Sequence, residues 1–283
     1  MDWTPGGLSG DVEDRRGSSG GFRGGGIGIL GFIILLVISL ITGRNYIGAY
    51  LAGGGNVSSA SANRPISAEE DRSAQLVSFV LDDVQKTWTE LLPAQTGRDY
   101  RHAKLVLFRD YTQSGCGVAQ SQTGPFYCPA DQKVYIDLGF WDELRRIGGS
   151  TADFAQAYVV AHELGHHVQN ILGVERKVRQ LSSQDPSQAN PLSVDLELQA
   201  DCLAGVWAHS TAERKIIDQG DVDAGLRAAA AVGDDHLQKM SRGAVSPETF
   251  THGSSAQRTG WFKRGLDQGT ISACNTFDSN GQL

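Results

Sequence analysis

The sequence predicts an α+β fold: a small, mostly antiparallel sheet plus several helices, preceded by a single transmembrane helix. Three observations support this prediction. Strand patterns are few and lie at 103–111 and 133–140, ahead of most helical patterns. Helical periodicity then dominates the C-terminal half of the chain. A long uncharged apolar run lies near the N-terminus, over residues 24–43.

The composition is that of an ordinary globular chain. Its 283 residues are 40% hydrophobic and 20% charged, and the net charge is −7 at pH 7. An acidic balance of this kind offers no basic face for phosphates, so we expect no nucleic-acid partner.

The apolar run predicts a membrane anchor. Its centre, residues 27–42, reads IGILGFIILLVISLIT. At ~1.5 Å per residue, a helix over the whole run reaches ~30 Å, about one hydrocarbon core. A cleaved signal peptide is the alternative, but the A-x-A-like site at Ala60-Ser61-Ala62 lies far beyond the run. A buried soluble helix fits less well, because the run has no polar stripe.

Basic residues around the run predict its orientation. Arg15, Arg16 and Arg23 precede it, whereas Arg44 alone follows closely. The positive-inside rule then places the N-terminus in the cytoplasm and residues 44–283 outside. We therefore expect a single-pass protein of the cell membrane with an extracytoplasmic domain, periplasmic or extracellular.

Composition divides the chain into four parts. Residues rich in Gly, Ser and Arg form a tail, and a Gly/Ser/Ala/Asn stretch forms a linker. The division is a disordered cytoplasmic tail at 1–24, the transmembrane helix at 25–43, a flexible linker at 44–66 and the folded domain at 67–283.

The folded domain begins with a helix, since Ser67 and Glu70 form a capping-box pattern and helical spacing continues to Pro93. In the strand at 133–140 apolar and polar residues alternate, which indicates a half-buried strand. Further helical patterns lie at 140–147, 151–172, 191–216, 221–241 and 254–267.

The four cysteines suit an extracytoplasmic domain, where an even number suggests disulfides. Three pairings are possible. Cys116 and Cys128 bracket a loop with Gly and Pro, which favours a Cys116–Cys128 bridge and leaves Cys202 with Cys274. Thiolate zinc ligation is the alternative, but the chain has no CxxC pair.

The stretch VVAHELGHHVQN contains an HExxH motif formed by His162, Glu163 and His166. Residues four apart share one helix face, so the two histidines can bind one ion together. Glu163 can then take a proton from a water that zinc activates. Helix signals support this context: a cap at Ser150 or Thr151 and Gly173 at the end.

A second helix, DLELQADCLAGVWA, supplies candidates for the third ligand. Glu197 and Asp201 are four apart among apolar neighbours, where two carboxylates are costly unless bound to something. Glu197 can ligate the metal, and Asp201 can fix the tautomer of a ligating histidine. Two alternatives stay open: a salt bridge to Arg or Lys, and the swapped assignment of the two carboxylates.

The chain resembles the zincin metallopeptidases, whose glutamate subgroup pairs HExxH with a downstream ExxxD on a second helix. It is more closely similar to the bacterial neutral zinc metallopeptidase family. The matching stretches span most of residues 67–277: GCGVAQSQTGPFYCPADQKVYIDLGFW, VVAHELGHHVQNILG, ELQADCLAGVWA, FTHGSSAQRTGWFKRG and CNTF.

The resemblance implies a zincin-like metallopeptidase domain. It implies Zn²⁺ bound by His162, His166 and Glu197, with Glu163 as the catalytic base, and a single-pass anchor as in many members. The sequence departs from the family pattern at His236, where we expect an arginine, and this argues against a catalytic role for His236.

Peptide hydrolysis also needs a donor to the developing oxyanion. His252 is our candidate, with Arg258 as its helper; capping or exposure of His252 is the alternative. Tyr135 is a weaker candidate, and His167 points away from His166, which favours packing or support of a ligand over ligation itself. By analogy with zincins, the strand at 133–139 is expected to bind substrate along a sheet edge.

These observations predict a membrane-anchored, zinc-dependent metallopeptidase that hydrolyses peptide or protein substrates. Its expected reaction uses a zinc-activated water with Glu163 as general base. A non-catalytic zincin-like domain that binds a peptide or cell-envelope partner is the alternative. A closed structural zinc site is a third interpretation, which a fourth ligand such as His167 or Asp201 would favour.

Overall fold

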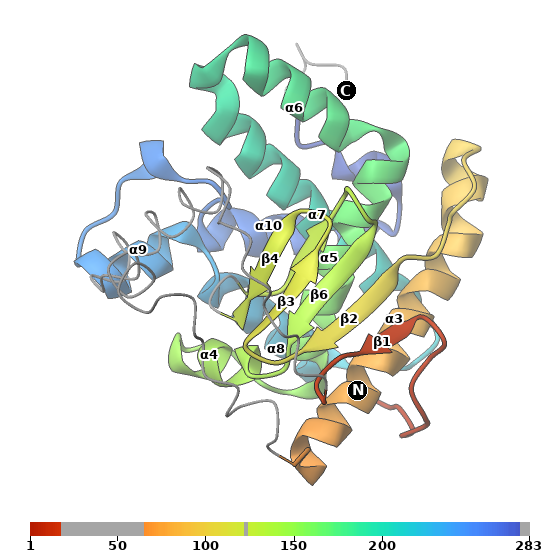
Figure 1. The fold of residues 1–283 in the computed structure, drawn as a ribbon. Coiled ribbons are helices and arrows are strands. Elements are labelled where there is room, and N and C mark those ends of the chain that lie inside the picture. Colours follow the sequence, from red (N-terminus) through yellow and green to blue (C-terminus); the bar gives the residue numbers. More distant parts are fainter. Residues whose placement is uncertain (18–64, 122–123, 278–283) are drawn as a thin grey trace.

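A computed structural model describes residues 1–17, 65–121 and 124–277, which form the predicted α+β fold (Figure 1). The helices are α3 (Ala68–Thr96), α4 (Phe140–Arg146), α5 (Asp153–Leu172), α6 (Val174–Gln184), α7 (Ala189–Glu213), α8 (Gln219–Ala231), α9 (Asp234–Arg242) and α10 (Ser255–Gln268). The strands are β1 (Val12–Asp14), β2 (Lys104–Phe108), β3 (Tyr111–Ser114), β4 (Gly117–Gln120), β5 (Phe126–Cys128) and β6 (Lys133–Asp137).

The main sheet has the order β1-β2-β6-β5, and β3 and β4 form a separate antiparallel hairpin. β1 and β6 both pair with β2 in parallel, and only the β5–β6 pair of this sheet is antiparallel. The expectation of a mostly antiparallel sheet was therefore wrong. The β3–β4 hairpin and β5 lie between β2 and β6 in the chain, so the chain turns back before β6 and re-enters the sheet parallel to β2.

The N-terminal segment, residues 1–17, differs from the disordered tail that composition predicted. Val12–Asp14 forms β1 at the edge of the sheet. Arg16 is only 2% exposed and pairs with Asp14 at 2.7 Å. Glycine content masked the pairing of β1, because its partner β2 lies about 90 residues further along the chain. Residues 18–24, the predicted transmembrane helix and the linker up to residue 64 lie outside the described residues.

Within 1–17, 65–121 and 124–277, no helix combines the length and apolar character that crossing a bilayer requires.

The core surrounds α5, which contacts α3, α7 and α8. Phe154 of α5 stacks on Trp207 of α7 with ring centroids 5.7 Å apart. α10 lies unusually close to α7 because both helices carry glycine at the contact. A Cβ on Gly265 would lie 1.9 Å from the Cys202 carbonyl, and one on Gly205 would lie 2.1 Å from the Phe262 carbonyl. This close approach brings α10 side chains to the polar residues of α7.

Both expected disulfides are present. Cys116–Cys128 joins the turn of the β3–β4 hairpin to β5, and Cys202–Cys274 joins α7 to the 3₁₀ turn Ile271–Cys274. Among the described residues no cysteine is free. The first bridge thus fixes β5, the edge strand of the main sheet, which lies against α5.

Helix α5 carries the HExxH motif and ends as predicted at Gly173, whose φ of 84° places it in the left-handed region. Its start differs from the prediction, because Ala152 is the N-cap and neither Ser150 nor Thr151 caps it through a side chain. The carboxylate of Asp153 instead accepts hydrogen bonds from Trp3 and Arg72. Helix α5 is therefore anchored through residues distant in sequence.

Candidate metal centre

Three predicted ligands meet between α5 and α7. His162, His166 and Glu197 each offer a donor atom, and these atoms lie within 4.8 Å of one another. His162 Nε2 lies 3.2 Å from Glu197 Oε2, and His166 Nε2 lies 3.4 Å from Glu197 Oε1. Ligands bound at ~2.1 Å in a tetrahedron would be roughly 3.4 Å apart. The donor set and its spacing therefore fit a zinc ion.

The outer nitrogen of each ring is already bonded. His162 Nδ1 lies 2.9 Å from Asp201 Oδ1, and His166 Nδ1 lies 2.7 Å from Gln169 Oε1. A carboxylate only accepts, and the Gln169 amide nitrogen donates to the Leu196 carbonyl at 2.7 Å. Both Nδ1 atoms therefore carry a hydrogen, and both Nε2 atoms face Glu197, as metal ligation requires.

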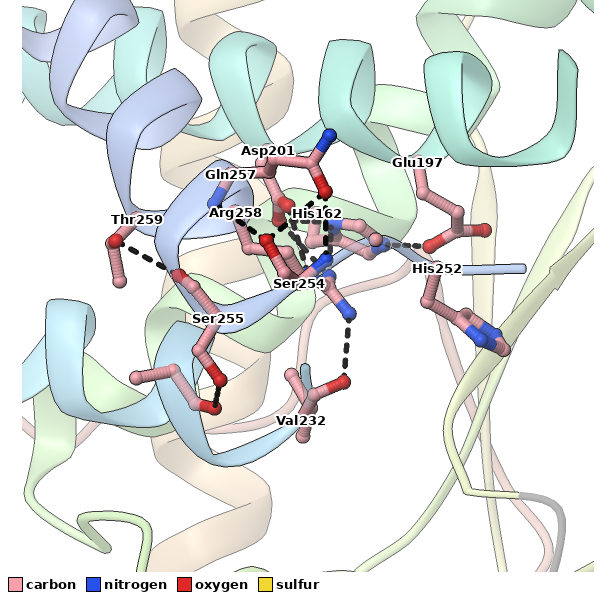
Figure 2. A network of polar contacts seen from close by, with 12 residues as sticks. His162, Glu197, Asp201, Val232, His252, Ser254, Ser255, Gln257, Arg258 and Thr259 are labelled. Atoms are coloured by element: carbon pink, nitrogen blue, oxygen red, sulfur yellow. Dashed lines mark hydrogen bonds and ion pairs between the residues drawn. The ribbon is translucent and has the colours of Figure 1, made fainter. Parts of the chain in front are cut away.

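Asp201 lies behind His162 in a buried polar network (Figure 2). Arg258 of α10 donates to Asp201 from Nε at 2.8 Å and from Nη2 at 3.0 Å, and the Tyr158 hydroxyl donates at 2.5 Å. Asp201 is 0% and Arg258 4% exposed. Such a pair is stable only when its hydrogen bonds are complete. Both oxygens of Asp201 are thus bound to Tyr158, His162 or Arg258 and do not face the metal-ligating atoms of His166 and Glu197.

This geometry decides between the alternatives that spacing left open. Glu197 faces both Nε2 atoms, whereas Asp201 touches only the outer nitrogen of His162. The swapped assignment is therefore not the one observed. The salt-bridge alternative holds in part, because Asp201 pairs with Arg258 and orients His162 at once. The sequence predicts Arg258 as a helper of His252, whereas Arg258 binds Asp201; neither this contact nor that of Gln169 with His166 follows from a local pattern.

Charges in the cluster shift one another's pKa. Burial opposes protonation of His162, but Asp201 and Glu197 outweigh it and raise the pKa of His162 to about 10. Burial also opposes ionisation of Glu197, yet the rings of His166 and His162 hold the pKa of Glu197 well below its usual range. A divalent cation at this point would take over the role of the ring protons.

Glu163, the second residue of HExxH, is only 7% exposed. Burial raises the pKa of its carboxyl group, and the neighbouring His162 and His166 oppose that shift. The backbone N–H of Tyr127 on β5 donates to this carboxylate. Glu163 is thus a buried acid held between the ligand helix and the edge strand, near both histidines but outside the ligand set.

His252 lies in the loop before α10 beside Glu197 (Figure 2). Asp234 Oδ2 accepts backbone N–H bonds from Thr251, His252 and Gly253 at 2.8, 2.6 and 3.0 Å, which fixes this loop. The ring is half exposed and lies 3.4 Å from Asp234 Oδ1. Burial opposes protonation, but this hydrogen bond raises the pKa of His252. The structure places His252 at the open side of the cluster.

The remaining candidates lie elsewhere. His167 is buried between the Tyr127 hydroxyl at 2.9 Å and the Arg101 carbonyl at 2.6 Å, which confirms a packing role. Tyr135 points to the other face of the sheet, where it stacks on Phe126 and donates to Asp131. Its strand β6 is interior, so the expected substrate edge at 133–139 was wrong; β5 is the edge strand beside β6.

The other histidines take structural partners. His236 lies 2.6 Å from the Ile147 carbonyl, His209 lies 2.7 Å from the Leu266 carbonyl and His102 lies 2.7 Å from Asp11. None of the three belongs to the candidate metal cluster.

Comparisons with known proteins agree with this site. The family described as "Putative neutral zinc metallopeptidase" matches residues 1–277. The chain belongs to this zinc metallopeptidase family. It is 49% identical to the uncharacterized protein YpfJ of Escherichia coli (strain K12) over 287 aligned residues, covering 98% of this chain and 99% of YpfJ.

The chain is also similar to the uncharacterized protein Rv2575 of Mycobacterium tuberculosis (strain ATCC 25618 / H37Rv). It is 42% identical over 209 residues, covering 70% of this chain and 68% of Rv2575. No solved structure matches the chain. Family membership implies Zn²⁺, and the cluster of His162, His166 and Glu197 is the group of described residues that offers its ligands.

Proposed function

We propose that this protein is a zinc-dependent metallopeptidase that hydrolyses peptide bonds, with Glu163 as general base. One observation carries the proposal: two Nε2 atoms and a carboxylate converge on one point, and a buried carboxyl group that is not a ligand lies beside it. Three protein ligands leave a fourth position for water, which is the pattern of catalytic rather than structural zinc.

When bound, zinc would polarise the scissile carbonyl and make a water acidic. The chain's own residues supply the remaining steps. Glu163 takes a proton from the attacking water and delivers it to the leaving amine. Its raised pKa suits this exchange, because the carboxyl group must hold the proton between the two transfers. Asp201 and Gln169 keep His162 and His166 oriented throughout.

His252 supports the reaction as donor to the oxyanion. Its ring lies on the open side beside Glu197, and Asp234 raises its pKa and so favours the charged, donating form. A pre-positioned donor of this kind stabilises the tetrahedral intermediate. Arg258, its expected helper, donates to Asp201 instead, and Asp201 in turn orients the ligand His162.

Strand β5 is the edge along which an extended peptide would bind. It pairs with β6 on one side only, and the Tyr127 N–H on its other side reaches Glu163. Backbone groups on the edge of a sheet can bind a substrate strand through main-chain hydrogen bonds. Because β5 adjoins Glu163, a peptide there would present its backbone to the base.

The alternative is a domain that binds zinc and a peptide or cell-envelope partner without turnover. The position of Glu163 argues against this alternative, since a binding module needs no buried base beside the metal. A closed structural zinc site finds no support within the described ranges. His167 is bound to Tyr127 and Arg101, and Asp201 to Arg258, so neither completes a tetrahedron.

The two disulfides support an extracytoplasmic location for the peptidase domain, because such bridges persist in oxidising compartments. The partner we propose there is a peptide or protein substrate, and the cofactor is Zn²⁺.

The test uses the full chain, produced in an oxidising compartment. Bound zinc and cleavage of an unstructured protein are measured for wild type, Glu163→Gln and Glu197→Gln. We expect wild type to hold zinc and cleave, Glu163→Gln to hold zinc without cleaving, and Glu197→Gln to lose zinc. Wild type that holds zinc but cuts no protein or peptide library would favour the binding-module alternative.

A further inference from the structure

The N-terminal segment, residues 1–17, is bound to the edge of the sheet through its backbone. β1 pairs in parallel with β2, with Val12 opposite Leu105 and Asp14 opposite Leu107. The Leu105 N–H donates to the Asp11 carbonyl at 2.9 Å, and the Arg15 N–H donates to the Leu107 carbonyl at 2.8 Å. The segment therefore completes one side of the main sheet.

Side chains make this edge specific. Asp11 accepts from Lys104 at 2.7 Å and from the buried Gln85 at 3.0 Å, and Gln85 in turn accepts from the Ala103 N–H at 2.7 Å. Glu13 pairs with Lys133 of β6 at 2.6 Å. Acidic groups of the segment thus meet basic groups of the sheet, with a buried amide between them.

The segment also reaches the helix that carries the metal ligands. The Trp3 indole N–H donates to Asp153 at the start of α5, at 2.7 Å. Arg72 of α3 binds the same carboxylate at 2.8 Å and stacks over the Trp3 ring at 5.2 Å. Residues 1–17 therefore link α3 to α5 and belong to the same packed unit as the metal centre.

The chain leaves and re-enters this unit at neighbouring points. Arg16, at the end of the segment, donates to the Glu70 carbonyl at 3.2 Å. Arg109 binds the Glu70 carboxylate and the Pro65 carbonyl, so it holds residue 65 beside the same first turn of α3. Residues 16 and 65 thus lie close to one place on the domain, and the apolar run of residues 24–43 is between them in sequence.

We propose that residues 1–17 are a structural part of the metal-binding domain and lie on the same side of the membrane as residues 65–277. A sheet cannot form across a bilayer, because its backbone hydrogen bonds join adjacent strands at about 4.8 Å. One passage of the membrane between residues 17 and 65 would separate β1 from β2. This arrangement replaces the single-pass orientation that flanking charge predicted, and it holds whether or not the domain is a peptidase.

Cysteine labelling tests the shared side. Gly6→Cys and Gly260→Cys place single thiols where nothing lies within 4 Å of a new Cβ. The four native cysteines are paired and give no background when oxidised. The full chain in spheroplasts is treated with a membrane-impermeant maleimide, before and after permeabilisation. We expect both positions to behave alike; labelling of one with protection of the other would overturn the proposal.

Cross-linking tests the docking itself. The Ser9 hydroxyl donates to the exposed Asp82 of α3 at 2.6 Å, so Ser9→Cys with Asp82→Cys brings two thiols together. Gly6→Cys with Asp82→Cys is the matched control. We expect mass spectrometry of the full chain from membranes to find the bridge in the first pair and at least tenfold less in the second. Equal yields in the two pairs would show that the segment is not docked at β2.

Discussion

The two sides of the metal cluster differ in how they are held. On the α10 side, Asp201, Arg258 and Tyr158 are buried and bound to one another. On the side of the loop before α10, His252 is half exposed, and its ring contacts Asp234 and the Thr251 hydroxyl. The closed side can fix ligand geometry, because its side chains have no freedom. The open side can meet a substrate, because its polar group is accessible.

The comparison predicts that substitutions on the closed side act on zinc and stability, and substitutions on the open side act on turnover. The largest effect is expected for Arg258→Met, which leaves the buried Asp201 without its cationic partner. Breaking a buried pair in this way costs about 3 to 5 kcal/mol of unfolding free energy. Denaturant unfolding of the zinc-loaded full chain measures it, with exposed Lys263→Met on the same helix as control.

An Arg258→Met protein as stable as Lys263→Met would contradict the view that the closed side is a charged support. Arg258→Lys sharpens the test. It restores the charge but not the two-nitrogen contact, so we expect stability to recover in part and zinc affinity to stay lowered.

On the open side, His252→Ala is expected to lower kcat by about 100- to 1,000-fold, the usual effect of losing one oxyanion donor. Zinc content and unfolding free energy should stay at the wild-type level, because the Asp234 bonds to the loop come from backbone N–H groups. Steady-state kinetics with one peptide measures the change. His209→Ala, remote from the cluster, is the control, and an equal loss there would remove the special role of His252.

The metal ligands and Asp201 were predictable from the sequence because of the periodicity of the α-helix. HExxH and ExxxD place polar residues four apart, and helix geometry alone puts each pair on one face. Hence spacing alone was enough to select four candidates: His162, His166, Glu197 and Asp201. Arg258 could not be placed, because its contact with Asp201 depends on the glycine-mediated approach of α10 to α7, which no local pattern encodes.

The sheet was predicted less well for the same physical reason. Strand alternation gives the faces of β2 and β6 but not their relative direction, which depends on how the chain turns back between them. β1 and β5 have three residues each and show no alternation to detect. Their stability comes from distant partners such as Lys133, and from the Cys116–Cys128 bridge.

Gln169→Ala tests the hydrogen bond that orients the other ligating histidine, His166, where a smaller effect is expected. Its amide orients His166, and it is held by the Leu196 carbonyl. Loss of such an outer partner lowers metal affinity by about 10- to 100-fold. Competition with a zinc chelator measures the affinity, and Gln180→Ala, exposed on α6, is the control. Unchanged affinity would mean that His166 is oriented by helix packing alone.

Zinc binding is also expected to depend on pH, and both sides of the cluster share this effect. His162 must lose its ring proton to bind zinc, and its pKa in the absence of metal is raised to about 10. Burial opposes protonation of His166, but Glu197 raises the pKa of this second ring as well. Below these pKa values the ion displaces ring protons, so the apparent affinity should rise at least about tenfold per pH unit between pH 6 and about 9. Calorimetry in two buffers of different ionisation enthalpy measures the released proton. In Asp201→Asn the carboxylate that raises this pKa is gone, so proton release at neutral pH should fall. Equal release from both proteins would show that the Asp201–Arg258 side does not control the charge of His162.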